Sequence, residues 1–453
     1  MKKFLNISLL SIVAVSALSL GSCSNEVDEI FDEDAVSRLE KEQKNYIDIL
    51  TDGGKGCRWQ LEYFANSDEP GYVYLMTFNK DGSVIISGKN EWIAYEVGAT
   101  RAVPTYATDT TLWDVITDNG PVLSFNTYSK IFHLFASPED IPSTDTEAPD
   151  ETGYGHNGDY EFDLMKFSND TLYVTGKKRG IDMIMTRVDT HNDGRERLSD
   201  QEYMDYVVAQ ADSFFHARIP QVYINLPNGN RWIVKDGATS ILKMWDQNQD
   251  EISTAEYHNV IITYDGLSFM NPITLDGYVL KNFIRQPDGS LLCRDDNQTT
   301  ITADDLNSVF GITTFTWKAD TTKFGGAFIR QVRALAKELK EFENRSLTSI
   351  QISYDSKTDS IYQIKFGCRK GKNTFTPTFN IDLTKVNGNQ LRFTYTGKCD
   401  AAGALHSENC PAMLGFVELL SKTCTLTTTS LLAPVDMWLT DSEDPNSYSY
   451  WKL

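Results

Sequence analysis

The chain has 453 residues and a formal net charge of −21 at pH 7. Such an acidic surface repels nucleic acid and anionic lipid, so we expect no nucleic-acid partner. The length exceeds what one compact core accommodates, and the hydrophobic share of 41% supplies apolar area for two or three domains.

The first segment, residues 1–22, is typical of a lipoprotein signal peptide. Two lysines precede an apolar run that ends at Leu20, long enough for secretion and short for a membrane span. The motif LGSC, which ends at Cys23, then matches the bacterial lipobox, in which cleavage precedes the cysteine and its thiol is acylated, for example with palmitate. An ordinary secretory signal that happens to precede a cysteine is the alternative.

Residues 23–34 form an acidic stretch, which we interpret as a tether behind the anchor. Acyl chains on Cys23 would hold the protein on a bilayer, because each buried methylene contributes about 0.8 kcal/mol. The acids are similar to the surface-export signal of Bacteroidetes-type lipoproteins, with a plain solvated tether as the alternative. We therefore predict a lipid-anchored outer-membrane protein, exposed at the cell surface, with a mature charge of −21 − 2 = −23.

Residues 35–197 predict a helix followed by strands. The apolar residues of 35–51 recur at helical spacing, and the glycine-rich sequence DGGKG then ends the helix. From residue 59 the apolar period changes to two, and roughly eight strand-like runs follow with short turns between them. We predict an N-terminal helix followed by an antiparallel lipocalin-like barrel or curled sheet.

Residues 198–301 repeat this plan on a smaller scale, with a helix over 198–217 and a second, smaller β unit after it. The sequence GNRW at 229–232 echoes GCRW at 56–59, which is too short to prove a duplication. Residues 302–453 predict an α+β unit, because an amphipathic helix at 326–344 and a second apolar helix accompany several strand-like runs. The chain as a whole is predicted to be mainly β.

Six cysteines remain after the lipidated one, and an exported chain can oxidise them. A bridge between Cys399 and Cys410 would close a short loop and contribute about 2–3 kcal/mol. A metal site that combines these two thiols with His406 is the other interpretation, although no C-x-x-C pair supports it.

Motifs of the common enzyme classes are absent from the sequence. There is no H-E-x-x-H zinc pattern, no G-x-S-x-G elbow, no phosphate-binding P-loop and no dinucleotide fingerprint. A hydrolase that uses acidic residues could be assembled from 63 carboxylates, but sequence cannot choose the pair. We therefore expect a non-catalytic protein.

One stretch has the acid spacing of a calcium-binding loop. Asp189, His191, Asp193 and Asp200 stand where an EF-hand places ligands, and Gly194 takes the position of its turn glycine. No helix precedes the stretch, and His191 stands where an oxygen ligand is usual. We interpret the stretch as an acidic linker that caps the next helix and predict no cofactor, with calcium binding as the alternative.

Aromatic residues beside polar or glycine-rich stretches are the remaining candidates for ligand binding. They are Trp92, Tyr106, Trp113, Tyr154 and Trp245. Exposed rings can stack on sugar faces and lose little entropy when they do so. The alternative is that these rings fill the cores of the strands.

Several motifs together resemble a family of Bacteroidetes lipoproteins that is classified as a domain of unknown function. They are GCRWQLEYF, YLMTFNKDGSVIIS, DNGPVLSFNTYSKIFHLFASP, GYGHNGDYEF, LYVTGKKRG and YDGLSFMNPI. The resemblance covers the chain from about residue 36 to its end. It implies a role beside a TonB-dependent transporter and its SusD-like lipoprotein partner, and it carries no catalytic residues to transfer.

These observations favour a non-catalytic surface lipoprotein that binds a nutrient, glycan or peptide, or that serves as an accessory subunit of a TonB-dependent uptake system. The alternatives are a structural or adhesive envelope protein and an acid-residue hydrolase. An aromatic-lined groove would favour binding, an exposed strand edge would favour adhesion, and two carboxylates about 5–9 Å apart in a deep cleft would favour hydrolysis.

Overall fold

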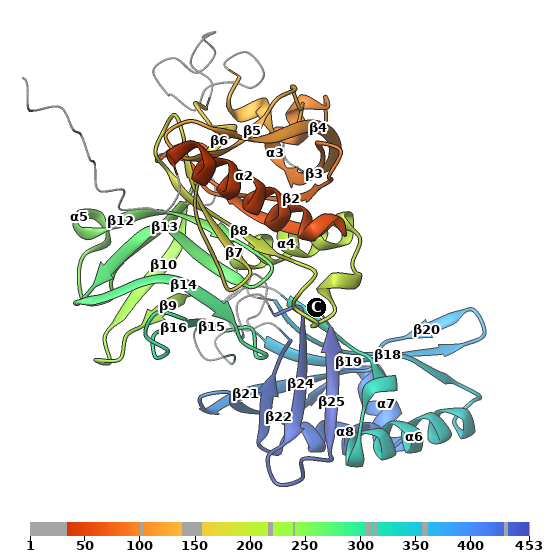
Figure 1. Ribbon diagram of the computed structural model, residues 1–453. Coiled ribbons are helices and arrows are strands. Elements are labelled where there is room, and N and C mark those ends of the chain that lie inside the picture. Colours follow the sequence, from red (N-terminus) through yellow and green to blue (C-terminus); the bar gives the residue numbers. More distant parts are fainter. Residues whose placement is uncertain are drawn as a thin grey trace, which may run out of the picture.

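The computed structural model describes residues 34–99, 103–137, 156–215, 221–238, 241–303, 306, 310, 315–355, 361–429 and 434–452. The signal peptide, Cys23 and Tyr154 lie outside these ranges, so the roles predicted for them stay predictions. Within the ranges the protein is mainly β, as predicted, and its strands form three antiparallel units (Figure 1).

The first unit is a helix followed by a closed barrel, which confirms the first of the two forms predicted for it. Its eight strands pair in chain order and β8 returns to β1. Helix α2 spans Ala35–Thr51, and a short helix α3 spans Glu91–Glu96. The strands are β1 (Arg58–Tyr63), β2 (Tyr72–Phe78), β3 (Ser83–Asn90), β4 (Thr105–Thr117), β5 (Pro121–Phe125), β6 (Glu161–Ser168), β7 (Thr171–Gly176) and β8 (Asp182–Arg187).

Alternation along β1 explains how the first barrel is filled. Trp59, Leu61 and Tyr63 point inward and are at most 1% exposed, since successive side chains of a strand face opposite sides. Helix α2 lies across this barrel (Figure 1), and the carbonyl of Leu50 accepts a hydrogen bond of 2.9 Å from Trp59 Nε1. The helix ends at Asp52, whose left-handed φ of 49° stops the helical ladder.

The second unit is also a closed eight-stranded barrel, so it has as many strands as the first although the sequence predicts a smaller unit. Helix α4 (Asp200–Phe215) leads into it, and the short helix α5 spans Glu251–Thr254. Strand β16 pairs with β9 to close the ring. The strands are β9 (Val222–Asn225), β10 (Arg231–Ala238), β11 (Ile241–Asp246), β12 (Glu256–Ile262), β13 (Gly266–Leu275), β14 (Tyr278–Arg285), β15 (Leu291–Cys293) and β16 (Thr300–Ala303).

The third unit is α+β, as predicted, and its sheet also closes on itself. Strand β18 pairs with both β17 and β19, so eight strands form a ring and β20 pairs outside it on β19. The strands are β17 (Phe315–Ala319), β18 (Ser346–Asp355), β19 (Ile361–Lys370), β20 (Asn373–Phe375), β21 (Thr378–Asn387), β22 (Gln390–Cys399), β23 (Cys424–Thr427), β24 (Asp436–Asp441) and β25 (Tyr448–Lys452).

Helices pack against that third sheet through their apolar faces. They are α6 (Gly326–Glu341), α7 (Ala401–Asn409) and α8 (Ala412–Leu420). Leu335 and Leu339 of α6 and Phe416 of α8 are fully buried in one core with the strands. None of the described helices is both long enough and apolar enough to span a bilayer.

The first two barrels are joined by direct packing. Tyr203 and Met204, at the start of α4, belong to the core of the first barrel, whereas Phe214 near its end belongs to that of the second. The amide of Gly71 donates a hydrogen bond of 2.9 Å to the carbonyl of Val260 in β12. The outer faces of the two barrels therefore face each other, and this arrangement creates the candidate site.

Candidate functional site

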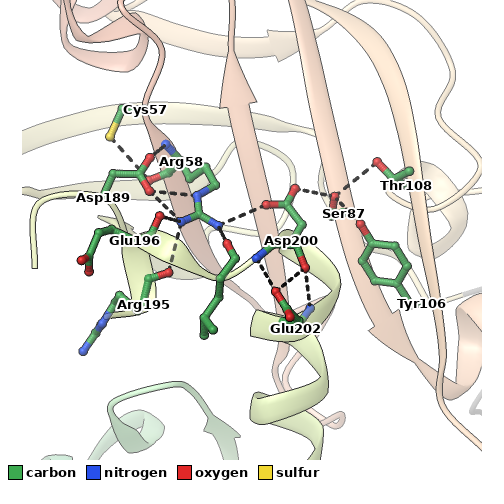
Figure 2. A network of polar contacts seen from close by, with 12 residues as sticks. Cys57, Arg58, Ser87, Tyr106, Thr108, Asp189, Arg195, Glu196, Asp200 and Glu202 are labelled. Atoms are coloured by element: carbon green, nitrogen blue, oxygen red, sulfur yellow. Dashed lines mark hydrogen bonds and ion pairs between the residues drawn. The ribbon is translucent and has the colours of Figure 1, made fainter. Parts of the chain in front are cut away.

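Two of the four candidate calcium ligands, Asp189 and Asp200, contact an arginine. Arg58, at the start of β1, donates from Nε to Asp189 Oδ1 at 2.9 Å and from its backbone amide to Asp189 Oδ2 at 2.9 Å. Its Nη1 lies 3.4 Å from Asp200 Oδ1. Figure 2 shows the guanidinium between the two carboxylates. Their charge is thus neutralised by a cation that belongs to the chain itself.

The other two candidate calcium ligands do not join Asp189 and Asp200. Asp193 binds Arg195, with 2.7 Å between Oδ2 and Nη2, and His191 is exposed. Asp200 accepts a second hydrogen bond of 2.9 Å from Ser87 Oγ. Across the described ranges, no three His, Cys, Asp or Glu side chains come together in a way that could hold a metal ion.

Arg58 is a structural anchor for the segment between the first barrel and α4. Its guanidinium also donates to three backbone carbonyls, those of Leu198 at 2.7 Å, Arg195 at 3.2 Å and Glu196 at 3.0 Å. A planar guanidinium presents five donors in a fixed fork, which suits this cluster of acceptors. The acid spacing read from the sequence therefore serves a loop-to-barrel connection.

Arg195 extends this connection to the second barrel. Its side chain is 7% exposed and contacts Asp265, at 2.5 Å between Nη2 and Oδ1, in the turn between β12 and β13. The guanidinium carbon also lies 4.4 Å from the centroid of the Tyr264 ring. A buried cation shared between two carboxylates and an aromatic face holds the two barrels in a fixed relation.

Three of the aromatic candidates are buried, so the prediction that they form exposed binding platforms is wrong. Trp92, Trp113 and Trp245 are 5–6% exposed. Trp92 Nε1 donates to Tyr72 Oη at 2.8 Å, and Trp113 Nε1 donates to the carbonyl of Ser83 at 3.0 Å. Trp92 and Trp113 belong to the core of the first barrel, whereas Trp245 is covered by Lys235 and Lys243, whose ammonium nitrogens lie 5.0 and 5.8 Å from its ring centroid.

Tyr106 is half-buried, and its hydroxyl lies 3.3 Å from Ser87 Oγ in the network around Asp200 (Figure 2). It does not face the cleft described below. Tyr154 lies outside the described residues.

Cys399 and Cys410 carry free thiols in the structure, which contradicts the disulfide predicted between them. Cys410 is fully buried in the third core, and burial raises its pKa to about 11, so the thiol stays protonated and unreactive. Cys399 is half-buried at the end of β22. His406 faces Arg345 Nη1 at 2.6 Å and the carbonyl of Ala402 at 2.7 Å, so both ring nitrogens are engaged and neither is open to a metal.

A cleft of about 920 Å³ lies between the outer faces of the first two barrels. Strands β1, β7 and β8 form one wall, and β13, β14 and the segment after β15 form the other. The same alternation that points Trp59 and Leu61 into the barrel points Gln60 and Glu62 out of it. Gln60 accepts a hydrogen bond of 2.8 Å from Tyr203 of α4, whereas Glu62 faces the cleft.

Glu62 is the unusual group of this cleft. The residue is 8% exposed, and its side chain makes no hydrogen bond or ion pair with any other described residue. Its cross-strand neighbours are Val73 and Ile184, which offer it no polar atom. Burial, reinforced by the charge of Asp265, raises the pKa of Glu62 to about 7, while two cations across the cleft act in the opposite direction.

Those two cations are Lys281 of β14, which is half-buried, and Arg294, which is exposed. Neither side chain has a hydrogen bond or ion pair to another residue that the structure describes. Two of the acids on the cleft wall are already neutralised, since Asp265 binds Arg195 and Asp170 lies 3.4 Å from Arg187. The charged groups of the cleft that are not held in an ion pair are therefore Lys281, Arg294 and the exposed Asp182, besides the buried Glu62.

Apolar side chains such as Met183, Ile184 and Phe269 form part of the cleft lining, together with polar, uncharged groups and one accessible ring. Tyr173 of β7 is 45% exposed. Hydroxyl and amide groups line both walls, from Ser168, Thr171, Thr186, Thr263, Ser268 and Asn282. One signal of this site is present in the sequence, a glutamate within the apolar run WQLEYF. The sequence cannot show that Lys281 and Arg294 lie across the cleft from this glutamate.

Comparison with known proteins places the chain in a family without assigning an activity. No curated protein matches it. A solved structure of MucB in complex with MucA(peri) aligns over 79% of this chain and 86% of that one, at 8% identity and a TM-score of 0.08, a similarity too low to indicate a common fold. Residues 27–287, more than half of the chain, match the profile of the domain of unknown function DUF4302. The chain belongs to this family.

Proposed function

We propose that the protein is a non-catalytic, lipid-anchored surface lipoprotein that binds a nutrient ligand in the cleft between its first two barrels. The observation that carries the proposal is Glu62, a buried carboxyl without a partner that faces a cavity of 920 Å³. A buried polar group without a partner destabilises a protein, and such groups persist mainly where a ligand completes them. Pockets of this size accommodate small molecules and short oligomers.

Binding is favoured over turnover by the state of the other carboxylates. Asp265 and Asp170 are held by arginines, and Asp182 is exposed and accepts a hydrogen bond of 2.7 Å from Thr175. Hydrolysis by acidic residues needs two carboxyl groups with separate roles at the reacting bond. Two of the three other carboxylates that line the cleft are therefore held by cations, and Asp182 is the one that has no ion pair with another described residue.

Cleft binding is tested by filling the cleft. Thr171→Trp places an indole on the cleft wall, and Thr316→Trp, on an exposed position of β17 in the third unit, is the matched control. The ligands to compare in thermal-shift measurements are neutral oligosaccharides, acidic oligosaccharides and peptides. We expect one of these ligand classes to raise the melting temperature of the wild type and of the control but not that of Thr171→Trp. A wild type that responds to no class, or a Thr171→Trp variant that responds equally, would contradict the proposal.

The membrane part of the proposal rests on the lipobox motif that ends at Cys23. Cys23→Ser removes the thiol that acyl chains require, so the variant should leave the membrane fraction, whereas the wild type should partition with outer membrane. Fractionation with immunoblotting and metabolic labelling with palmitate measure this. Cys57→Ser, at a buried cysteine of the mature chain, is the control and should stay with the membrane. Equal fractionation of all three proteins would overturn lipid anchoring.

The role as an accessory uptake subunit is tested by affinity capture of the acylated protein from native outer membrane, followed by mass spectrometry. Stoichiometric recovery of a TonB-dependent transporter with its SusD-like lipoprotein would support it. Recovery of the protein alone would leave a free-standing surface binder.

A further inference from the structure

We propose that the inter-barrel cleft binds an oligosaccharide that carries carboxylate groups, an inference that rests on the ligand-binding function proposed above. Three features of the cleft lead to it. They are two cations without partners among the described residues, a set of hydroxyl and amide groups, and an exposed tyrosine together with a buried glutamate.

The cations specify the charge of the ligand. Lys281 and Arg294 converge on the cleft from adjacent segments, because Arg294 directly follows β15, which pairs with β14. The backbone amide of Arg294 also donates 2.7 Å to the carbonyl of Asn282, which fixes the segment beside β14. A guanidinium binds a carboxylate through paired, charge-assisted hydrogen bonds. The net charge of −21 repels anions elsewhere on the surface, so an anionic ligand would be drawn to this local exception.

The uncharged groups specify a sugar. Hydroxyls of Ser168, Thr171 and Ser268 both donate and accept hydrogen bonds, which matches the hydroxyl groups of a saccharide ring. The face of Tyr173, 45% exposed, offers the apolar surface on which a pyranose stacks. Glu62 in its protonated form is a donor and an acceptor as well, so it can satisfy a sugar hydroxyl at the floor of the cleft.

A peptide fits these walls less well. Extended peptides are commonly bound by adding a strand to an open sheet edge. Strands β1, β7, β8, β13 and β14 each pair with a strand on both sides inside closed barrels, so no edge is offered. A side-chain-lined cleft without a free edge suits a ligand that brings its own hydroxyl and carboxylate groups.

The state of Glu62 gives binding a pH dependence. The charged or titratable groups around it are Asp265, Lys281 and Arg294 from the second barrel and Tyr203 from α4, with Asp170, Tyr173, Asp182 and His191 on the cleft wall. Because burial raises the pKa of Glu62 to about 7, ionisation above neutral pH adds a negative charge at the floor of the cleft. That charge repels an anionic ligand.

Tri-galacturonate is the probe, with galactotriose as its uncharged counterpart, and isothermal titration calorimetry measures both. We expect tri-galacturonate to bind and galactotriose to bind at least about ten-fold more weakly. Arg294→Gln and Lys281→Gln should each weaken tri-galacturonate binding about ten-fold, since each removes a charge-assisted hydrogen bond. Lys318→Gln, at an exposed position of β17, is the control and should bind like the wild type.

The pH series supplies a readout that a general loss of structure would not give. Affinity of the wild type should fall from about pH 5.5 to about pH 8, while carboxyls of the ligand stay ionised throughout because their pKa values lie near 4. Glu62→Gln should bind with a weaker pH dependence, and the difference between the two proteins isolates Glu62 because all other titratable groups are shared.

The outcomes separate this inference from the proposed function. Equal binding of the two trisaccharides, or tri-galacturonate binding that survives both cleft substitutions, would overturn carboxylate recognition while cleft binding stands. Carboxylate recognition would also be overturned if peptides were the only ligand class in the thermal-shift screen whose stabilising effect is lost in Thr171→Trp. If neither trisaccharide binds, the sugar class is wrong, and the comparison of Thr171→Trp with Thr316→Trp decides the proposed function independently.

Discussion

Replacing Arg58 with methionine is expected to lower the free energy of unfolding of the first barrel by about 3 kcal/mol. Methionine replaces the apolar stem of the arginine side chain and offers no hydrogen-bond donor. Asp189 and Asp200 would lose the cation that neutralises them, and three backbone carbonyls would lose their hydrogen-bond donor. Water reaches part of both carboxylates, whose side chains are 35% and 25% exposed, so the loss stays below that of a fully buried pair.

Hydrogen exchange of the β1 and β8 amides, followed by mass spectrometry, measures this loss in the first barrel separately from the other two units. Arg58→Lys should lose most of the same stability, because a lysine offers three donors from one point instead of a planar fork. Arg231→Met is the matched control. It occupies the second Gly-x-Arg-Trp sequence, yet its side chain is exposed and lies 5.1 Å from the Tyr223 ring centroid.

The control should change the free energy of unfolding by no more than about 0.5 kcal/mol, as is usual for exposed positions. If Arg58→Met were as stable as Arg231→Met, the anchoring role assigned to the network in Figure 2 would be wrong.

Glu62→Gln is expected to stabilise the protein at alkaline pH and to leave it unchanged at acidic pH. The folded-state pKa of Glu62 is about 7, above its ordinary value of 4.5, so the folded state binds the extra proton between these values. Stability of the wild type therefore falls as pH rises from about 4.5 to about 7 and stays lower above that window. Glutamine never ionises, so at pH 8 the free energy of unfolding of the variant should exceed that of the wild type by about 3 kcal/mol.

Denaturant unfolding at about pH 5 and about pH 8 measures the effect, and Glu40→Gln, at an exposed position of α2, is the control. The control should show no change in its stability relative to the wild type between the two pH values. An equal response of Glu62→Gln and Glu40→Gln would show that Glu62 is solvated in the folded protein. A substitution that stabilises the protein and weakens the pH dependence of ligand binding is the behaviour expected of a group kept for function.

Much of the fold could be predicted from local sequence patterns. The period of two in WQLEYF places Trp59, Leu61 and Tyr63 on one face and Glu62 on the other, as the structure has them. The helical period over 35–51 likewise gave α2 its bounds, and the turn sequence DGGKG gave its end. Such patterns are readable because they depend on residues a few positions apart.

The candidate site could not be predicted in this way. The acids at 189–200 have the spacing of a calcium loop, but the cation that they bind is Arg58, 131 residues from Asp189 in sequence. The tryptophans at 92, 113 and 245 lie beside polar loops, and only closure of the sheets shows that they are buried. In both cases the residues that decide the role of the local pattern lie far from it in the sequence.

By itself, the sequence determined the succession of helices and strands, the mainly β character and the membership of residues 27–287 in their family. Tertiary structure alone decided that all three sheets close on themselves, that Arg58 contacts two of the candidate calcium ligands, and that Glu62 shares a cleft with Lys281 and Arg294. The physical reason is that periodicity records which face of an element is apolar, whereas the charge and burial of a site depend on which faces meet.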